Sequence, residues 1–313
     1  MSPPLDWLSR LLNLIPVRGQ LDVRCHYGAP WRIDQEPMPP GEMPYHVVLA
    51  GSAVLEDPVS GQTEVLTKGD ILLLGEGGAH VLHDGSGAPS APTRVRMGFN
   101  VSISENAGQG EPLDLLCGRF VVAAPHDRLL RDYLPPRLVV HAAGDAAASD
   151  TDTALQLEHL LALMRSESSG DHLGGRAMLN GLSTALFALT LRLASQLSQP
   201  PSGLLALAGH PRLAPALTAM FNEPARAWTL PELAQLCSMS RATFVRHFQD
   251  ATGRTAGDLL VDIRMTLAAR ELRKPSVSIG TVADSVGYRS EAAFQRAFKH
   301  YMGTTPARWR RQA

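Results

Sequence analysis

Three cysteines are the side chains of this 313-residue sequence with the most distinctive chemistry. Cys25, Cys117 and Cys237 are too few and too widely spaced for a disulfide framework or a structural zinc site, because both need closely spaced pairs. Any chemistry they perform must therefore be individual. A thiol becomes reactive when a nearby cation or base favours its thiolate.

Cys25 lies in residues 21–27, LDVRCHY, whose alternation predicts a β-strand. Successive side chains of a strand face opposite sides, so Arg24 and His26 would point away from the thiol. Tyr27 would share its side, together with apolar neighbours. That is the pattern of an inert core thiol. Activation of Cys25 would need a group from elsewhere in the fold.

Two histidines, His46 and His80, are the candidates for that group. Residues 69–80, GDILLLGEGGAH, resemble the second motif of cupins, in which a Gly-Asp turn enters a strand and a histidine faces the barrel. His46 stands where metal-binding cupins have His-x-His followed by Glu, but Val48 replaces the second histidine and the glutamate has no counterpart.

His46 and His80 are therefore candidate metal ligands only if a third ligand completes the set, because a reactive mononuclear site needs about three protein ligands. The side chains that could complete it are Cys25, His26 and His83. The alternative is that both histidines are hydrogen-bonded in the barrel core, and we expect no cofactor.

The last hundred residues contain a repeated segment. SRATFVRHFQDATGRTA and SEAAFQRAFKHYMGTTP agree at seven positions with a constant offset of 50. The agreeing pairs are Ser240 and Ser290, Ala242 and Ala292, Phe244 and Phe294, Arg246 and Arg296, Phe248 and Phe298, Gly253 and Gly303, and Thr255 and Thr305. Upstream of these segments, once one extra residue is allowed in the second turn, Ala234 matches Ala283 and Ser238 matches Gly287.

Each copy predicts a short helix, a tight turn and a second helix. Thr229 and Glu232 have the spacing of a capping box, and Ser240 and Ser290 can cap the second helices. Two phenylalanines four residues apart bury one face of each second helix, which leaves the arginine between them exposed. This is a helix-turn-helix with a polar recognition helix. Cys237 falls on the first helix beside leucines, and we expect it in the core.

Residues 210–313 resemble the DNA-binding domain of the AraC/XylS family of transcription regulators, in which a long helix joins two helix-turn-helix units. That helix would be GDLLVDIRMTLAARELR, residues 257–273. The resemblance implies binding to double-stranded DNA, homodimerisation through the N-terminal half, contact with RNA polymerase and activation of transcription. The DNA-binding positions that it implies are Ser240, Arg241, Ala242, Val245, Arg246, Gln249, Ser290, Glu291, Ala292, Gln295, Arg296 and Lys299.

Arg246 and Arg296 are the residues we expect to read bases most strongly, because arginine can hold guanine through two hydrogen bonds. Ala242 and Val245 offer no hydrogen bonds, so the first helix would read thymine methyl groups or DNA shape there. Other basic residues would bind phosphate, which fixes the register.

The N-terminal half resembles a cupin-bearing subgroup of AraC-type regulators that senses reactive chlorine. Cys25 precedes GAPW in a matching context, and Cys117 in LLCGRF resembles the second cysteine of that subgroup. The resemblance implies that oxidation of Cys25, with a disulfide to Cys117 as one product, switches DNA binding. Core packing of Cys25 is the alternative.

Composition and charge agree with a two-part protein. Apolar residues make up 44% and charged residues 19%, which is typical of globular proteins, and no run of 18 apolar residues suggests a membrane span. Residues 210–313 hold 15 Lys and Arg against 8 Asp and Glu, while residues 1–209 hold 14 against 22. A basic C-terminal part that follows an acidic N-terminal part indicates that the C-terminal part binds nucleic acid. The first residues lack the pattern of a secretory signal, so we expect a cytoplasmic location without membrane partners.

The expected fold class is α+β multidomain, with a cupin-like β-barrel and dimerisation helices followed by an all-α domain. Short strands at about ten-residue spacing favour the barrel. The expected segments are a sensory and dimerisation domain at 1–198, with its barrel at about 20–125 and helices at about 150–198, a linker at 199–209 and the DNA-binding domain at 210–313.

Two other functions remain open at this point. The barrel could bind a small ligand or a metal and regulate DNA binding without thiol chemistry. A metal-dependent cupin enzyme with an appended DNA-binding module is disfavoured by the incomplete ligand set, and no nucleophile or phosphate-loop motif indicates another enzyme. We therefore expect that the protein is not an enzyme.

Overall fold

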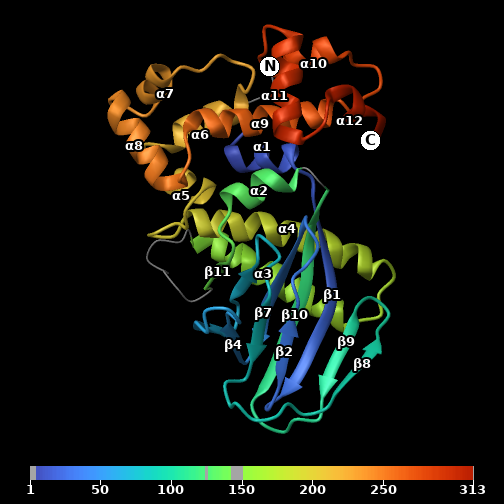
Figure 1. The fold of residues 1–313 in the computed structure, drawn as a ribbon. Helices are drawn as coiled ribbons and strands as arrows, with labels where there is room; N and C mark the ends of the chain where they lie inside the picture. Colours follow the sequence, from blue (N-terminus) through green and yellow to red (C-terminus); the bar gives the residue numbers. More distant parts are fainter. Residues whose placement is uncertain (1–4, 124–125, 142–150, 313) are drawn as a thin grey trace. The chain divides into compact units, whose positions relative to one another are not determined.

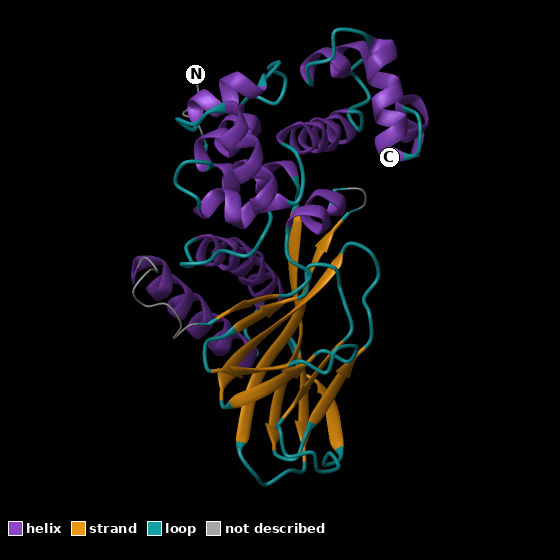
Figure 2. Cartoon of the chain, turned by 60° about the vertical axis from the view of Figure 1, so that its left-hand side comes forward, coloured by secondary structure: helices purple, strands orange, loops and turns teal. Residues whose placement is uncertain are grey.

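The computed structural model describes residues 5–123, 126–141 and 151–312, and the chain folds into two compact units. The sensory unit comprises Val17–Val122 and Pro135–Pro201. The helical unit comprises the described residues of Met1–Pro16, Ala123–Leu134 and Ser202–Ala313. All the strands belong to the sensory unit, which also contains two long helices, and the other unit is helical (Figure 2), which confirms the predicted fold class.

The sensory unit contains two β-sheets (Figure 1). The seven-stranded sheet has the order β11-β6-β3-β10-β1-β9-β8, and the four-stranded sheet has the order β2-β7-β4-β5. The strands are β1 (Val17–Gly28), β2 (Arg32–Gln35), β3 (Glu42–Ala50), β4 (Ser52–Glu56), β5 (Thr63–Thr67), β6 (Ile71–Leu73), β7 (His80–His83), β8 (Thr93–Met97), β9 (Ser102–Asn106), β10 (Pro112–Val122) and β11 (Leu138–Val140).

A hydrophobic cluster with side chains from both sheets forms the core of this unit. Leu115 and Val48 come from the larger sheet, and Leu55, Leu66 and Leu82 come from the smaller one. Both Cys25 and Cys117 belong to this cluster. The strands that carry them, β1 and β10, are antiparallel neighbours in the middle of the larger sheet.

Helices α3 (Thr151–Ser169) and α4 (Gly175–Ser195) complete the sensory unit. Helix α4 packs on β1, where a side chain at Gly19 would collide with the backbone of Ser183. The Ser183 hydroxyl lies 2.7 Å from the Tyr45 hydroxyl, and Phe187 packs against Phe120. Helix α4 is long and apolar enough to cross a membrane by length and composition. Its packing on β1 accounts for the buried part of this apolar surface, which includes Leu179, Leu186 and Phe187.

The helical unit contains the two predicted helix-turn-helix copies. Its helices are α1 (Trp7–Leu14), α2 (Asp127–Tyr133), α5 (Leu204–Gly209), α6 (Ala214–Asn222), α7 (Leu230–Leu236), α8 (Arg241–Thr252), α9 (Ala256–Glu271), α10 (Ile279–Ser285), α11 (Glu291–Met302) and α12 (Pro306–Gln312). Helix α9 is the expected long helix between the copies, and α8 and α11 are their second helices.

Helices α1 and α2 are the main difference from the expected domain limits, because they belong to the helical unit although their sequences flank the barrel. The Arg270 guanidinium donates to the Asn13 carbonyl, and the Tyr133 hydroxyl donates to Asp262 at 2.7 Å. Leu11 is fully buried. Local sequence patterns cannot reveal this, since the partners lie more than a hundred residues away.

The expected linker at residues 199–209 also differs from the structure. Residues 204–209 form helix α5, whose Leu204, Leu205 and Leu207 are fully buried. The QPPSG segment predicted a break, but the apolar run after it is packed into the helical unit. Residues 124–125 of the expected barrel and residue 150 of the expected helices lie outside the described residues.

Candidate functional site

The first helix-turn-helix is built from local signals in its sequence. The Thr229 side chain and Glu232 form the predicted capping box at the start of α7. A tight turn follows, and the Ser240 hydroxyl accepts a hydrogen bond from the Thr243 amide at the start of α8. In the second copy the Ser290 hydroxyl accepts from the Ala293 amide in the same way. These caps fix where each recognition helix begins.

Both recognition helices have the same pattern of burial. Phe244 and Phe248 of α8, like Phe294 and Phe298 of α11, are at most 1% exposed, with ring centroids 5.6 Å apart in each pair. The opposite faces are exposed. They contain all twelve residues that the sequence assigned to DNA: Ser240, Arg241, Ala242, Val245, Arg246, Gln249, Ser290, Glu291, Ala292, Gln295, Arg296 and Lys299.

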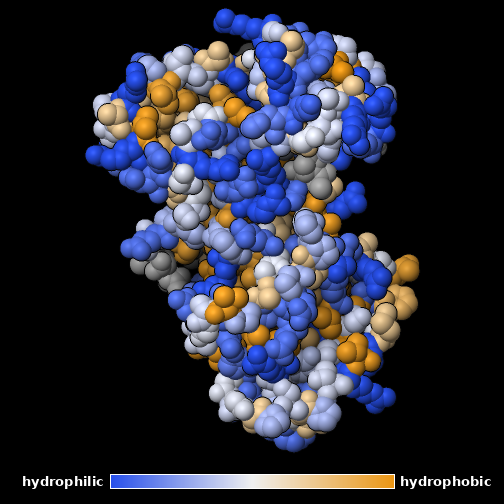
Figure 3. Space-filling model, in the orientation of Figure 1, coloured by the Kyte–Doolittle hydropathy of each residue, from blue (hydrophilic) through white to orange (hydrophobic). Residues whose placement is uncertain are grey.

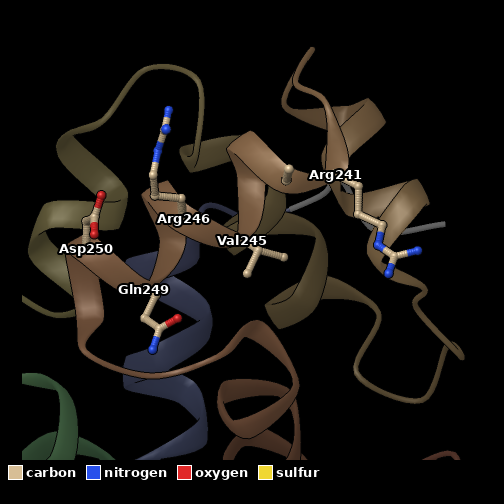
Figure 4. Close-up of a pocket in the computed structure, with 6 residues that line it drawn as sticks. Arg241, Val245, Arg246, Gln249 and Asp250 are labelled. Carbon is tan, nitrogen blue, oxygen red and sulfur yellow. The ribbon is translucent and has the colours of Figure 1, made fainter.

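The exposed face of α8 is an open concave surface lined by six residues: Arg241, Ala242, Val245, Arg246, Gln249 and Asp250. Figure 4 shows Val245 and Gln249 on the same side of the helix and Arg246 extending from the other flank. Among the described residues, Arg241 and Arg246 take part in no ion pair, so both guanidinium groups are available to an external partner.

Apolar surface also gathers on the first helix-turn-helix, over α7 and α8 (Figure 3). Leu236 is 43% exposed and Val245 is 37% exposed. A valine on a recognition helix can contact the methyl group of thymine in the major groove. The face of α8 therefore combines cationic and apolar contacts.

Cys25 and Cys117 meet in the core of the sensory unit. Cys25 pairs with Leu115 across β1 and β10, and Cys117 pairs with Val23, so the two cysteines are diagonal neighbours. Both thiols belong to the same buried cluster as Tyr27, and Cys25 interacts with the side chains of Cys117 and Tyr27. Both thiols are free and buried, with exposed fractions of 3% and 9%.

His46 and His80 extend this contact into a chain of hydrogen bonds. Cys117 lies opposite His46 across β10 and β3, and its sulfur is 3.1 Å from Nδ1 of His46. Nε2 of His46 is 2.7 Å from Nε2 of His80, and Nδ1 of His80 is 3.1 Å from the Gly78 carbonyl oxygen. The chain therefore crosses the core from β1 to β7.

The two thiols differ in acidity. The interaction with Cys117 stabilises the thiolate of Cys25 and lowers its pKa, whereas the interaction with Cys25 and complete burial raise the pKa of Cys117 well above its ordinary value. Burial lowers the pKa of His46 well below its usual range and also lowers the pKa of His80. Between the two thiols, Cys25 is the one that loses its proton more easily.

Arg24 and His26 lie on the other face of β1, as the strand alternation predicts. The Arg24 guanidinium donates to Asp114 through Nε at 2.8 Å and Nη2 at 2.7 Å, and Nη1 donates to Ser168. His26 Nδ1 is 3.7 Å from the same carboxylate. Neither side chain lies on the face of β1 that carries the Cys25 thiol.

The histidine pair does not fit a metal ion. Two nitrogens bound to one tetrahedral ion at about 2.05 Å would be about 3.3 Å apart, whereas the two Nε2 atoms form a hydrogen bond at 2.7 Å. Within the described ranges, no group of three or more His, Cys, Asp or Glu side chains could hold a metal ion. His26 and His83, which could have completed the set, lie near the carboxylates of Asp114 and Glu56.

The sequence predicted the cysteines, histidines and tyrosine of the cysteine site but not two groups that hydrogen-bond to them. The Ser104 hydroxyl lies 2.7 Å from the Tyr27 hydroxyl, because β9 runs parallel to β1 with Ser104 opposite Cys25. The Gly78 carbonyl is the second group. No signal in the sequence indicates a parallel pairing or a backbone acceptor.

Cys237 lies where the sequence predicts it, in the core of the first helix-turn-helix. It is 2% exposed, and burial raises its pKa. It belongs to the helical unit, whereas Cys25 and Cys117 belong to the sensory unit.

Comparisons with known proteins agree with this organisation. The chain matches a family model described as "Cupin" over residues 6–196 and one described as "Helix-turn-helix domain" over residues 233–312. It is 30% identical to a "Putative AraC-like transcription regulator" of Streptomyces lividans, over 98% of each chain. It is 28% identical to the "RCS-specific HTH-type transcriptional activator RclR" of Escherichia coli, over 98% of this chain and 97% of that protein.

Among solved structures, the DNA-binding domain of AdpA, "the global transcriptional factor, in complex with a target DNA", is 29% identical. The match covers 33% of this chain and 91% of that chain, with a TM-score of 0.30. The relatives that span the whole chain are transcription regulators and not enzymes. The chain belongs to the AraC-like transcription regulators and is a DNA-binding regulator with an N-terminal cupin domain.

Proposed function

We propose that this regulator responds to oxidants through Cys25, with a disulfide between Cys25 and Cys117 as the switched state. The observation that carries the proposal is the placement of the two buried thiols as diagonal neighbours on the adjacent strands β1 and β10, where their side chains interact. A pair already in contact can be joined when its sulfur atoms approach to a bond of about 2.05 Å. A lone core cysteine would have no such partner.

The chain connectivity supports a route from this pair to the DNA-binding unit. Val17 at the start of β1 pairs with Val122 at the end of β10, and both strands lead directly into segments of the helical unit. A disulfide would change the local geometry of both strands. This change would reach the helical unit through two adjacent connections.

The DNA-binding part of the proposal assigns roles to the exposed residues of α8 and α11. Arg246 and Arg296 read guanine, Ala242 and Val245 contact thymine methyl groups or read DNA shape, and other basic residues bind phosphate and so fix the register. The proposal further includes a homodimer, contact with RNA polymerase during activation, and a cytoplasmic location. The relative RclR is named as an "RCS-specific" transcriptional activator, which is consistent with this assignment.

The test is a DNA-binding titration of the full-length protein on its own promoter region at fixed salt, reduced and after one equivalent of hypochlorite. Mass spectrometry maps the thiols in the same samples. We expect a change in DNA affinity of about 5- to 150-fold, the usual range of coupling between two sites, together with a Cys25–Cys117 disulfide that reductant reverses. Cys25→Ser and Cys117→Ser should abolish the change.

Cys237→Ala is the matched control, because it removes the third buried cysteine, which lies in the helical unit and is not part of the Cys25–Cys117 pair. It should keep the full response. If the DNA affinity of the Cys25→Ser variant still changes under the condition that induces the wild-type protein, oxidation of Cys25 is not the signal. A small ligand of the barrel then becomes the better explanation.

A further inference from the structure

The hydrogen-bonded chain through His46 and His80 has a direction that the atoms themselves fix. A carbonyl oxygen only accepts hydrogen bonds, so Nδ1 of His80 carries a proton and donates it to Gly78. In a neutral imidazole the other nitrogen is then an acceptor. Nε2 of His80 therefore accepts from Nε2 of His46, which leaves Nδ1 of His46 as the acceptor for the Cys117 thiol.

The same logic extends to Cys25. Because the Cys117 proton is directed to His46, the lone pairs of the Cys117 sulfur are free to accept the proton of the Cys25 thiol, its diagonal neighbour across β1 and β10. All donors in the resting chain thus point one way, from Cys25 through Cys117 and His46 to His80. A concerted shift of each proton by one step leaves a thiolate on Cys25 and an imidazolium on His80.

We propose that Cys117, His46 and His80 form a proton relay that deprotonates Cys25 when it attacks an oxidant. The inference rests on the proposed function, because it names the base for the cysteine that senses the oxidant. It assigns to the two cupin histidines a role in thiol activation. It also explains how Cys25 can react although Arg24 and His26 face away from it.

The reaction balances with hypochlorous acid as the oxidant. The Cys25 sulfur attacks chlorine, the S–Cl bond forms, the O–Cl bond breaks and hydroxide leaves, while the Cys25 proton is passed along the relay to His80. The Cys117 sulfur then attacks the Cys25 sulfur and expels chloride. The Cys117 proton converts hydroxide to water, so two thiols lose two electrons and chlorine is reduced to chloride.

The relay is neutral at rest. Burial lowers the pKa of both imidazoles, so neither holds an extra proton near neutral pH. The hydrogen bond that His80 donates to the Gly78 carbonyl acts in the opposite direction and raises the pKa of His80, which makes His80 the better terminal acceptor of the two. The thiolate therefore forms only as the sulfur reacts, and the buried site carries no standing charge.

The first test measures the rate at which iodoacetamide, an uncharged reagent, alkylates Cys25 in the reduced full-length protein. A positioned base contributes about 10²- to 10⁴-fold to a rate, so His80→Gln and His46→Gln should slow alkylation at least about tenfold. His83→Gln is the matched control, since His83 lies on the same strand β7 but outside the relay. It should keep the wild-type rate.

The second test needs no substitution in the relay. Nitrogen-15 NMR of the reduced protein distinguishes histidine tautomers, and we expect the Nε2–H form for His46 and the Nδ1–H form for His80. The opposite tautomers, or an unchanged alkylation rate in a folded His80→Gln variant, would overturn the relay.

The two tests separate this inference from the proposed function. Alkylation and tautomers report on the relay whether or not oxidation alters DNA binding. If the relay variants slow alkylation but hypochlorite leaves wild-type promoter affinity unchanged, the relay stands and the redox switch fails. If hypochlorite switches DNA binding equally fast in wild type and in His80→Gln, the switch stands and the relay fails.

Discussion

The two helix-turn-helix copies share one backbone plan but present different surfaces. In the first turn the Met239 amide donates to the Ala234 carbonyl at 2.9 Å, and in the second the Tyr288 amide donates to the Ala283 carbonyl at the same distance. Yet Arg241, Val245 and Gln249 of α8 correspond to Glu291, Gln295 and Lys299 of α11. The buried positions therefore define the fold of each copy, and the exposed ones define what it can bind.

The turn residue itself also differs between the copies. Ser238 and Gly287 occupy equivalent positions, and both have positive φ angles, 51° and 83°. Glycine adopts this conformation without strain, whereas a residue with a side chain is destabilised by about 1 to 2 kcal/mol. The second copy requires glycine for another reason, because a Cβ at Gly287 would collide with the Ala225 carbonyl oxygen.

The largest effect should come from the shared core. Phe244→Ala and Phe294→Ala each remove a fully buried ring, and each should lower the free energy of unfolding of the helical unit by about 3 to 5 kcal/mol. Urea unfolding followed by circular dichroism measures the loss. Phe294 also packs against Tyr288 at 5.7 Å, so its loss should be the greater of the two. Equal losses would show that this extra contact contributes nothing.

Gly287→Ala should come next. It combines the cost of a positive φ with a collision against the backbone at Ala225, so we expect a loss of more than about 2 kcal/mol in the free energy of unfolding. Gly303→Ala is the control, because Gly303 has a positive φ of 70° and open space around its Cβ position. If both variants lose the same stability, the collision is not the cause.

Arg246→Ala and Arg296→Ala test whether the two copies contribute alike to DNA recognition. Each should weaken specific binding by about 1 to 3 kcal/mol, which is roughly 5- to 150-fold, while leaving the thermal unfolding temperature unchanged. The measurement is a promoter titration at matched salt. Arg32→Ala removes the same charge from the sensory unit and should have little effect. Unchanged operator affinity in either arginine variant would remove that residue from the interface.

Ser238→Gly should have the smallest effect, and it should be stabilising. Relief of the positive-φ strain of about 1 to 2 kcal/mol is partly offset by the extra flexibility of glycine in the unfolded chain, about 0.4 to 1 kcal/mol. We therefore expect a gain of about 0.5 to 1 kcal/mol in the urea experiment. A loss of stability would mean that the Ser238 side chain makes a contact that outweighs its strain.

Much of the DNA-binding unit could be predicted from sequence because its signals are local. Capping residues and paired phenylalanines, which lie within a few residues of one another, predict α7, α8 and α11. The repeat at an offset of 50 residues then identifies α8 and α11 as equivalent helices. Helices α1 and α2 could not be placed in the same way. Their contacts, such as Tyr133 with Asp262, join segments that no short pattern connects.

The sequence by itself determined the recognition helices, the strand faces of the barrel and the identity of the cysteines and histidines that could do chemistry. Those features follow from periodicity and residue type, which act over a few residues. Only the tertiary structure decided that Cys117, His46 and His80 form one hydrogen-bonded chain with Cys25 beside its first member. The physical reason is that strand order and register, set by the packing of the whole core, bring four separate strands into contact at that point.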